Sequence, residues 1–140
     1  MKTVILLILT AIFWGMTPIL EKIGLTKTDP MTGLTIRSIV VMIVILTYTI
    51  STGTLKKIFL LDNKTLIIFA VSGVLAGVLG MITYFHALQL GATSKIVPIA
   101  ATYPLVTAVL SVLILGESIS LVRILGTAFI VIGIWLVKSH

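Results

Sequence analysis

The sequence predicts an all-α integral membrane protein with five transmembrane helices. Hydrophobic residues make up 59% of the 140 residues, and charged residues make up only 10%, against roughly 25% in soluble domains. A soluble domain of this length could not bury so much apolar surface. The apolar runs are also longer than the ~10-residue alternating strands of a barrel, and helices satisfy their own backbone groups in lipid.

Five apolar runs approach the ~20 residues that a helix needs to cross a bilayer. We expect transmembrane helices at residues 3–22, 33–51, 65–88, 95–115 and 121–138. The longest connection, residues 52–64, leaves no room for a soluble domain, so residues 1–140 are expected to form a single transmembrane domain. The first run follows Lys2 but has no small-residue cleavage site after it, which argues against a cleaved signal peptide.

Positive charges flank these helices in nearly equal numbers on the two sides of the membrane. Five spans put the chain ends on opposite sides, so one side would hold Lys2, Lys56, Lys57, Lys64 and Arg123. The other side would hold Lys22, Lys27, Lys95 and Lys138, with Arg37 near the start of the second span. The positive-inside rule needs an imbalance to set the orientation. Either the rule acts weakly here, or copies insert in both directions and pair as an antiparallel, dual-topology dimer.

The composition argues against several other classes of protein. The net charge is +6, but the cations are scattered singly or in pairs, as is typical of groups that meet anionic lipid headgroups. The expected partner is therefore the lipid bilayer and not a nucleic acid. The chain has no cysteine and no metalloprotease, hydrolase or phosphate-loop motif. We expect no catalytic residue, no metal, no cofactor and no enzyme activity.

Polar and aromatic residues inside three of the runs predict a substrate cavity. Polar faces within a membrane usually look inward, and Trp14 and Tyr103 lie well inside their runs instead of at the ends, where interfacial aromatic residues gather. The residues expected to line the cavity are Trp14, Thr17, Tyr84, Tyr103 and Thr107. The alternative is that the hydroxyl groups bond their own backbone and that the rings only mark the membrane interface.

Small residues predict where helices approach one another closely. Gly73, Gly77 and Gly80 follow one another along the third run, and Gly126 and Gly133 lie on one face of the fifth. We expect the first group to pack against a neighbouring helix. The second pair would make either a contact inside the chain or a contact with another subunit.

Two prolines are expected to kink their helices, because proline lacks an N–H and clashes with the preceding turn. These are Pro18 in the first run and Pro104 in the fourth. Pro98 is expected to lie in the first turn after Ser94, a candidate N-cap, where a missing N–H costs little.

Few titratable groups lie near or inside the spans. His86 is the only readily titrating side chain well inside an uncharged stretch, so it is a candidate for proton coupling, although it could simply reach toward the headgroups. Glu117 and Arg123 are expected to cap the turn between the fourth and fifth spans. Glu117→Ala should then lower expression more than substrate affinity.

Three stretches of the sequence resemble a known family. "AIFWGMTPILEKIG", "TGLTIRSIVV" and the closing part from "YFHALQLGATSK" to "GIWLV" resemble an EamA-type half of the drug/metabolite transporter superfamily. The positions that match the pattern of that family are Ala87, Leu88, Ser94, Pro104, Gly116, Glu117, Gly126 and Gly133. The chain also resembles the four-span multidrug exporters, but Trp14 stands where those proteins have a mid-span glutamate, which weakens a cationic-drug assignment.

The resemblance implies one half of an inverted-repeat transporter for small metabolites, either amino-acid-like or other small organic solutes, in the plasma or inner membrane. Such a half would need a second copy, as an antiparallel homodimer, or a paralogous half to complete a pathway by alternating access. Two alternatives stay open. One is a non-transporting scaffold or accessory subunit with a filled centre, and the other is a subunit of a lipid-linked carrier flippase.

Overall fold

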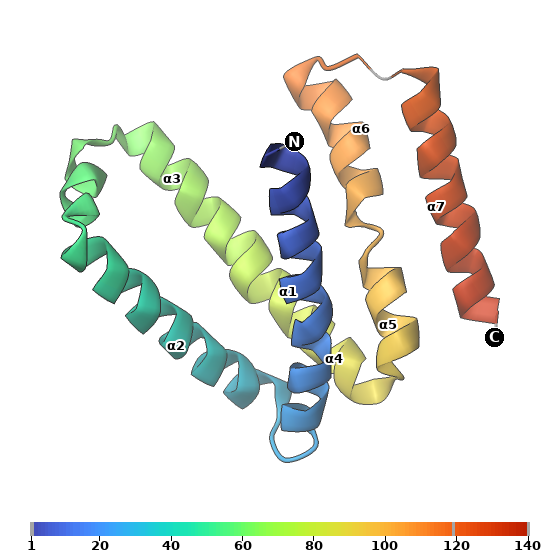
Figure 1. The fold of residues 1–140 in the computed structure, drawn as a ribbon, viewed down its shortest axis with the longest axis horizontal. Coiled ribbons are helices and arrows are strands. Elements are labelled where there is room, and N and C mark those ends of the chain that lie inside the picture. The colour runs from blue at the N-terminus through green and yellow to red at the C-terminus, as the bar shows by residue number, and fades with distance from the viewer. Residues whose placement is uncertain (1, 119, 140) are drawn as a thin grey trace. The chain divides into compact units, whose positions relative to one another are not determined.

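The computed structural model describes residues 2–118 and 120–139, without the side chains of residues 123, 138 and 139. Every element of regular structure in this part of the chain is helical (Figure 1). The contacts divide the chain into two compact units, an N-terminal unit (Met1–Gln89) and a C-terminal unit (Leu90–His140).

The N-terminal unit begins with two long helices, α1 (Lys2–Leu25) and α2 (Pro30–Ser51). Helix α1 continues without a break through Pro18, which is buried. Asp29 is the N-cap of α2: its Oδ1 accepts a hydrogen bond from the Thr32 amide at 3.0 Å, and Pro30 occupies the first turn. This cap starts the second helix three residues before the expected position 33.

The third span is preceded by a short 3-10 helix, η1 (Thr54–Leu60), and combines three helical segments. They are α3 (Asn63–Ser72), the π-helix η2 (Gly73–Gly80) and α4 (Met81–Leu90). Asp62 caps α3, because its carboxylate accepts bonds from the Thr65 amide at 3.0 Å and from the Thr65 hydroxyl at 2.6 Å. The span therefore covers Asn63–Leu90, which is 28 residues.

The π-helical segment coincides with the sequence "GVLAGVLG". A Cβ atom on Gly80 would lie 3.2 Å from the carbonyl oxygen of Leu75, which is tighter than ordinary contact. At Gly73 and Gly77, an added Cβ would meet no atom within 4 Å in the described part of the N-terminal unit. The helical neighbour expected for these two glycines is therefore not within this unit.

The buried core of the N-terminal unit lies at one end, where α1, α2 and α4 meet (Figure 1). The buried apolar side chains are Leu25, Leu34, Phe85 and Leu88. Gly33 allows close contact here, because a Cβ atom at this position would already touch the side chains of Leu25 and Phe85 at 3.6 Å. Elsewhere the apolar side chains of the three helices are mostly exposed, as expected of surfaces that face lipid.

The C-terminal unit contains α5 (Thr93–Ala100), α6 (Tyr103–Leu115) and α7 (Leu121–Ser139). The expected kink at Pro104 within one helix is replaced by an interruption at Ala101 and Thr102, and Pro104 lies in the first turn of α6. Because Pro104 has no N–H to bond the Ala100 carbonyl, the ladder restarts with the Leu105 amide bonded to Thr102 O at 2.9 Å.

The fourth span also starts at a different residue from the expected one. The N-cap of α5 is Ala92, and Ser94 lies within the helix, so the prediction that Ser94 is the cap is wrong. Pro98 is consequently inside α5, beyond its first turn. The extended backbone of Ala92 starts the helix without any side-chain hydrogen bond, a start that no capping residue in the sequence signals.

Four helical segments are long and apolar enough to cross a membrane, judged by length and composition within the described residues. They are Lys2–Leu25, Pro30–Ser51, Asn63–Leu90 and Thr93–Leu115. A shorter apolar helix, Ile124–Val137, lies within α7. The all-α membrane fold class is therefore confirmed, with a fifth helix that is less clearly apolar over a full span than the other four.

Candidate functional site

Each unit has a cavity to whose lining a few polar side chains contribute. The cavity of the N-terminal unit has a volume of about 380 Å³ and lies where α1, α2 and α4 meet. Its polar lining comes from Thr17, Glu21, Thr28 and Arg37, and its apolar lining includes Leu20, Ile36 and Phe85. We call the core of Leu25, Leu34, Phe85 and Leu88 the buried corner of this unit. Its residues Leu25 and Phe85 form one wall of the cavity.

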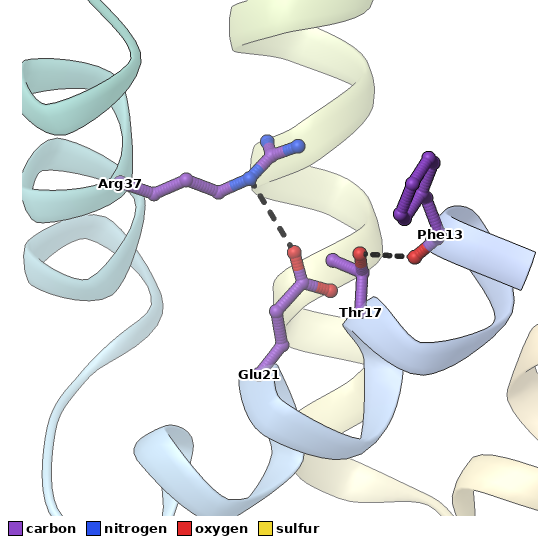
Figure 2. A network of polar contacts seen from close by, with 4 residues as sticks. All are labelled: Phe13, Thr17, Glu21 and Arg37. Atoms are coloured by element: carbon purple, nitrogen blue, oxygen red, sulfur yellow. Dashed lines mark hydrogen bonds and ion pairs between the residues drawn. The ribbon is translucent and has the colours of Figure 1, made fainter. Parts of the chain in front are cut away.

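Glu21 of α1 and Arg37 of α2 form an ion pair at this cavity (Figure 2). Arg37 Nε lies 3.5 Å from Glu21 Oε1, and the side chain of Glu21 is only 9% exposed, whereas that of Arg37 is 43% exposed. No described residue donates a hydrogen bond to Glu21 Oε1. Buried carboxylate oxygens normally accept hydrogen bonds, so this atom is the most unusual polar group in the N-terminal unit.

Helices α1 and α4 cap each other at their C-terminal ends. Lys22 Nζ of α1 donates to the carbonyl oxygens of Leu88 at 2.6 Å and Gln89 at 3.1 Å. Gln89 Nε2 in turn donates to the carbonyl oxygens of Leu25 at 3.3 Å and Thr28 at 3.4 Å. A lysine at a helix C-terminus meets unpaired carbonyl groups and the negative end of the helix dipole. These bonds fix the ends of α1 and α4 relative to each other.

The cavity of the C-terminal unit is larger, about 580 Å³, and lies between α6 and α7. From α6 it is lined by Tyr103, Thr107 and Ser111, and from α7 by Ile124, Thr127 and Val131. Glu117, which follows α6, also lines it. Helix α6 ends just before this residue, because Gly116 takes the left-handed conformation and the Glu117 amide bonds to Ser111 O at 3.2 Å.

The five residues expected to line one cavity are divided between the two units. The structure places Thr17 in the N-terminal cavity, and Tyr103 and Thr107 in the C-terminal cavity. Trp14 is 65% exposed and lines neither of these cavities. Tyr84 also lines neither, and its ring lies 6.2 Å from the ring of Phe85, centroid to centroid.

The hydroxyl groups of the two threonines bond to their own helices. Thr17 Oγ1 donates to Phe13 O at 2.8 Å (Figure 2), and Thr107 Oγ1 donates to Tyr103 O at 3.1 Å. A hydroxyl group that donates one hydrogen bond can still accept another through its oxygen. Each threonine hydroxyl can therefore still offer its cavity a hydrogen-bond acceptor.

Among the described residues, His86, Gly126 and Gly133 line neither of these cavities. His86 is exposed, and its Nδ1 lies 2.8 Å from Ile82 O, so the proton on Nδ1 is the one engaged with the backbone. Added Cβ atoms on Gly126 and Gly133 would meet nothing within 4 Å in the described part of the C-terminal unit. The side chain of Arg123 lies outside the described residues, so its expected role in the turn stays a prediction.

The sequence places Arg37 near the start of the second span, but no partner was predicted for it, and Glu21 was not singled out. The sequence did contain a signal for this pair. Glu21 and Arg37 have opposite charges and lie on either side of the short connection between two consecutive helices, and such helices are antiparallel neighbours. No group of three or more histidine, aspartate or glutamate side chains that could hold a metal ion lies among the described residues.

Helices of membrane length and apolar composition define a multi-pass membrane protein. The chain belongs to the EamA-like transporter family, whose model matches residues 1–139. The resemblance that the sequence indicated is therefore confirmed.

Two curated relatives are similar to this chain over most of their own length. One is an uncharacterised transporter of a Sinorhizobium species, named for its place in the cobO 3' region, with 31% identity over 90% of this chain and 89% of the relative. The other is an uncharacterised protein of Methanocaldococcus jannaschii, with 33% identity over 99% of this chain and 98% of the relative. No solved structure matches the chain.

Proposed function

We propose that the chain is one half of a transporter for small metabolites, amino-acid-like or other small organic solutes, in the plasma or inner membrane. Two copies in opposite orientations would supply the inverted repeat that many transporters use, with solute sites between the repeats and alternating access to the two sides. The observation that carries this proposal is the pair of mainly apolar cavities with a few polar side chains between the helices, neither of which is enclosed by its own unit. The family is a family of transporters, which favours transport over enzymatic activity.

The antiparallel arrangement is supported by the distribution of charge and by one glycine face. Nearly equal numbers of lysine and arginine residues flank the spans on each side, so neither orientation is strongly preferred. On α7, Gly126 and Gly133 meet no neighbour within the described part of their unit, so the backbone of a second helix could approach them closely.

Uptake into proteoliposomes that contain the purified chain tests the transport function. We expect saturable uptake of at least one solute from a panel of amino acids, sugars and amines, measured with and without a pH gradient. A panel that shows no uptake above protein-free liposomes would instead support the accessory-subunit alternative. If a pH gradient accelerates uptake equally in the native chain and in His86→Ala, His86 is not the coupling residue.

Topology and assembly can be tested separately, because the chain contains no cysteine and single cysteines are therefore unique labels. A cysteine replacing Gly126 or Gly133 should crosslink copies of the chain, whereas one at the exposed Leu60 in η1 should not. A C-terminal reporter should be found on both sides of the membrane. A reporter on one side only would end the dual-topology proposal and leave a paralogous half as the partner.

A further inference from the structure

The connection between α2 and α3 carries the short helix η1 at a surface of the membrane. Helix α2 has 22 residues and is therefore about 33 Å long, close to the ~30 Å thickness of the hydrocarbon core. Figure 1 shows η1 at the end of α2 that lies away from the buried corner. The buried corner and η1 thus lie toward opposite surfaces of the bilayer.

The backbone of this connection has a defined conformation. Gly53 takes the left-handed conformation just before η1, and the hydroxyl groups of Thr52 and Thr54 are hydrogen-bonded at 2.7 Å. At the other end of η1, the Leu61 amide donates to Ile58 O at 3.2 Å. The side chains of η1 are therefore presented from a folded segment, which lowers the cost of binding a partner.

The side chains of η1 combine cations with large apolar groups. A 3-10 helix has three residues per turn, so Lys56 and Phe59 share one row of side chains, and Lys57 and Leu60 share the next. Both lysines are exposed, and Phe59 and Leu60 are 83% and 84% exposed. The rise of about 2 Å per residue places each cation about 6 Å along the axis from the apolar residue of its row.

The cations of this surface have no anionic partner in their own unit. Among the described residues, no ion pair or side-chain hydrogen bond involves Lys56, Lys57 or the exposed Lys64 at the start of α3. The acidic residue nearest to them in the sequence is Asp62, and its carboxylate accepts the bonds from Thr65 that cap α3. The surface therefore offers positive charge and apolar groups together.

An anionic lipid surface matches both features of η1. Lysine side chains near such a surface are attracted to it, and apolar side chains enter the boundary between headgroups and acyl chains to a depth of about 5–10 Å. A soluble acidic partner would leave Phe59 and Leu60 in water. We propose that η1 binds anionic phospholipids, with Lys56 and Lys57 on the headgroup phosphates and Phe59 and Leu60 against the first part of the acyl chains.

This inference goes beyond the proposed transport function and does not rest on it, because it concerns the lipid-facing surface of the chain. Lysines at the ends of spans meet headgroups in general. A site at η1 makes a sharper prediction: the lipid beside η1 should be preferentially anionic, whereas the lipid beside an apolar face without cations should show no such preference.

The first experiment measures this preference with a single tryptophan in the full chain, reconstituted in lipid nanodiscs. Phe59→Trp places an aromatic reporter in η1, and Trp14→Phe with Trp135→Phe removes the two native tryptophans. Brominated phosphatidylglycerol and brominated phosphatidylcholine with the same acyl chains are compared as quenchers of its fluorescence. We expect the anionic lipid to associate at least about fivefold more strongly, the effect of about one lysine near an anionic surface. Equal quenching by the two lipids would overturn the proposal.

The matched control keeps the native Trp14 as the reporter, with Trp135→Phe as the one change. Trp14 is 65% exposed on α1, and no lysine lies within two turns of it along the helix. The two brominated lipids should quench it to the same extent. A preference for the anionic lipid as large as that at position 59 would show a property of the whole chain, and it would contradict a site at η1.

The second experiment changes the charges in the chain that carries the reporter at position 59. Lys56→Gln with Lys57→Gln should lower the preference to the value of the control, whereas Lys56→Arg with Lys57→Arg should retain it. Lys27→Gln changes an exposed lysine beyond the end of α1 and should have no effect. A preference that survives the two glutamine substitutions would overturn the proposal.

Two further measurements keep the test decisive. If the glutamine variant fails to fold, the parent chain is measured at high salt, which screens exposed charges and should reduce the preference. A preference that does not change with salt would contradict the proposal. If neither lipid quenches the reporter and Leu60→Cys crosslinks copies of the chain, a second copy covers η1, and the lipid site is wrong.

Discussion

The two units differ in how their helices are held together. In the N-terminal unit, Lys22 and Gln89 reach from one helix to cap another, and four apolar side chains are buried beneath them. In the C-terminal unit, the hydroxyl groups of Thr102, Thr107 and Ser111 bond to carbonyl oxygens in their own segments, and no described residue is buried. The first unit contains a fixed corner with charges at defined positions, whereas the second offers an open surface that lipid or another protein must cover.

The largest expected difference between the units is the effect of removing one aromatic side chain. Phe85 is 2% exposed and Phe129 on α7 is 73% exposed. Phe85→Ala should lower the free energy of unfolding by about 3–5 kcal/mol, because it empties the core of the corner. Phe129→Ala should change it by less than about 0.5 kcal/mol. Unfolding in mixed micelles, followed by helical circular dichroism, measures both, and similar losses would remove the contrast between the units.

A smaller effect is expected from the cap that Lys22 provides. Lys22→Met keeps the apolar stem but leaves the carbonyl groups of Leu88 and Gln89 without this donor. The free energy of unfolding should fall by about 1–3 kcal/mol. Lys27→Met changes an exposed lysine beyond the end of α1 and is the matched control. If the same unfolding assay gives equal values for both variants, the mutual capping of α1 and α4 does not stabilise the corner.

The glycines of the π-helical segment should differ from one another. Gly80→Ala would push a methyl group to 3.2 Å from Leu75 O and should destabilise the chain by about 1 kcal/mol, as small overpacking changes do. Gly77→Ala meets no such atom in its unit and should be neutral or stabilising by about 0.5–1 kcal/mol, since alanine is the better helix former. A loss at Gly77 of the same size, found in the dimer only, would show instead that this face packs on a second subunit.

The smallest effect concerns pH and the two helix caps. Hydrogen bonds from the Thr65 hydroxyl, and then from the Thr65 amide, lower the pKa of Asp62 below its ordinary value of 3.8. A carboxyl with a lowered pKa stabilises the folded state above pH 3.8 and loses this contribution as the pH falls through the lowered value. Hydrogen bonds from Thr32 lower the pKa of Asp29 in the same way.

Stability should therefore decline slightly as the pH falls below about 4, the ordinary aspartate pKa. Asp62→Asn keeps a capping oxygen but cannot titrate. The variant should therefore lose less stability at low pH, by the amount that Asp62 contributes. Parallel thermal melts of the native chain and the variant at several pH values provide the measurement. An unchanged decline would mean that other groups control the acid sensitivity.

The fold class could be predicted from the sequence because composition alone requires a bilayer around this chain. The start of α2 could also have been located, since Asp29 and Pro30 form a recognisable start signal. The interruption before Pro104 was harder to place, because a proline indicates that the helical ladder must break but not which preceding residues leave it. The π-helix coincides with three glycines inside a long span, and the periodicity of apolar residues does not distinguish a π-helix from an α-helix.

The site was less predictable than the fold, because it depends on contacts between helices. Thr17, Tyr103 and Thr107 were singled out as polar residues within apolar runs, and the structure divides them between two cavities. The pairing of Glu21 with Arg37 requires the two helices to lie in the register that the buried corner sets. Patterns along one helix carry no information about that register.

The central proposal, that this chain moves a small organic solute, is tested most directly by uptake of a panel of radiolabelled metabolites into proteoliposomes that contain the purified chain. We expect saturable uptake of at least one solute of the panel, because the chain belongs to a family of transporters. Uptake that does not exceed that of protein-free liposomes for any solute would contradict the proposal.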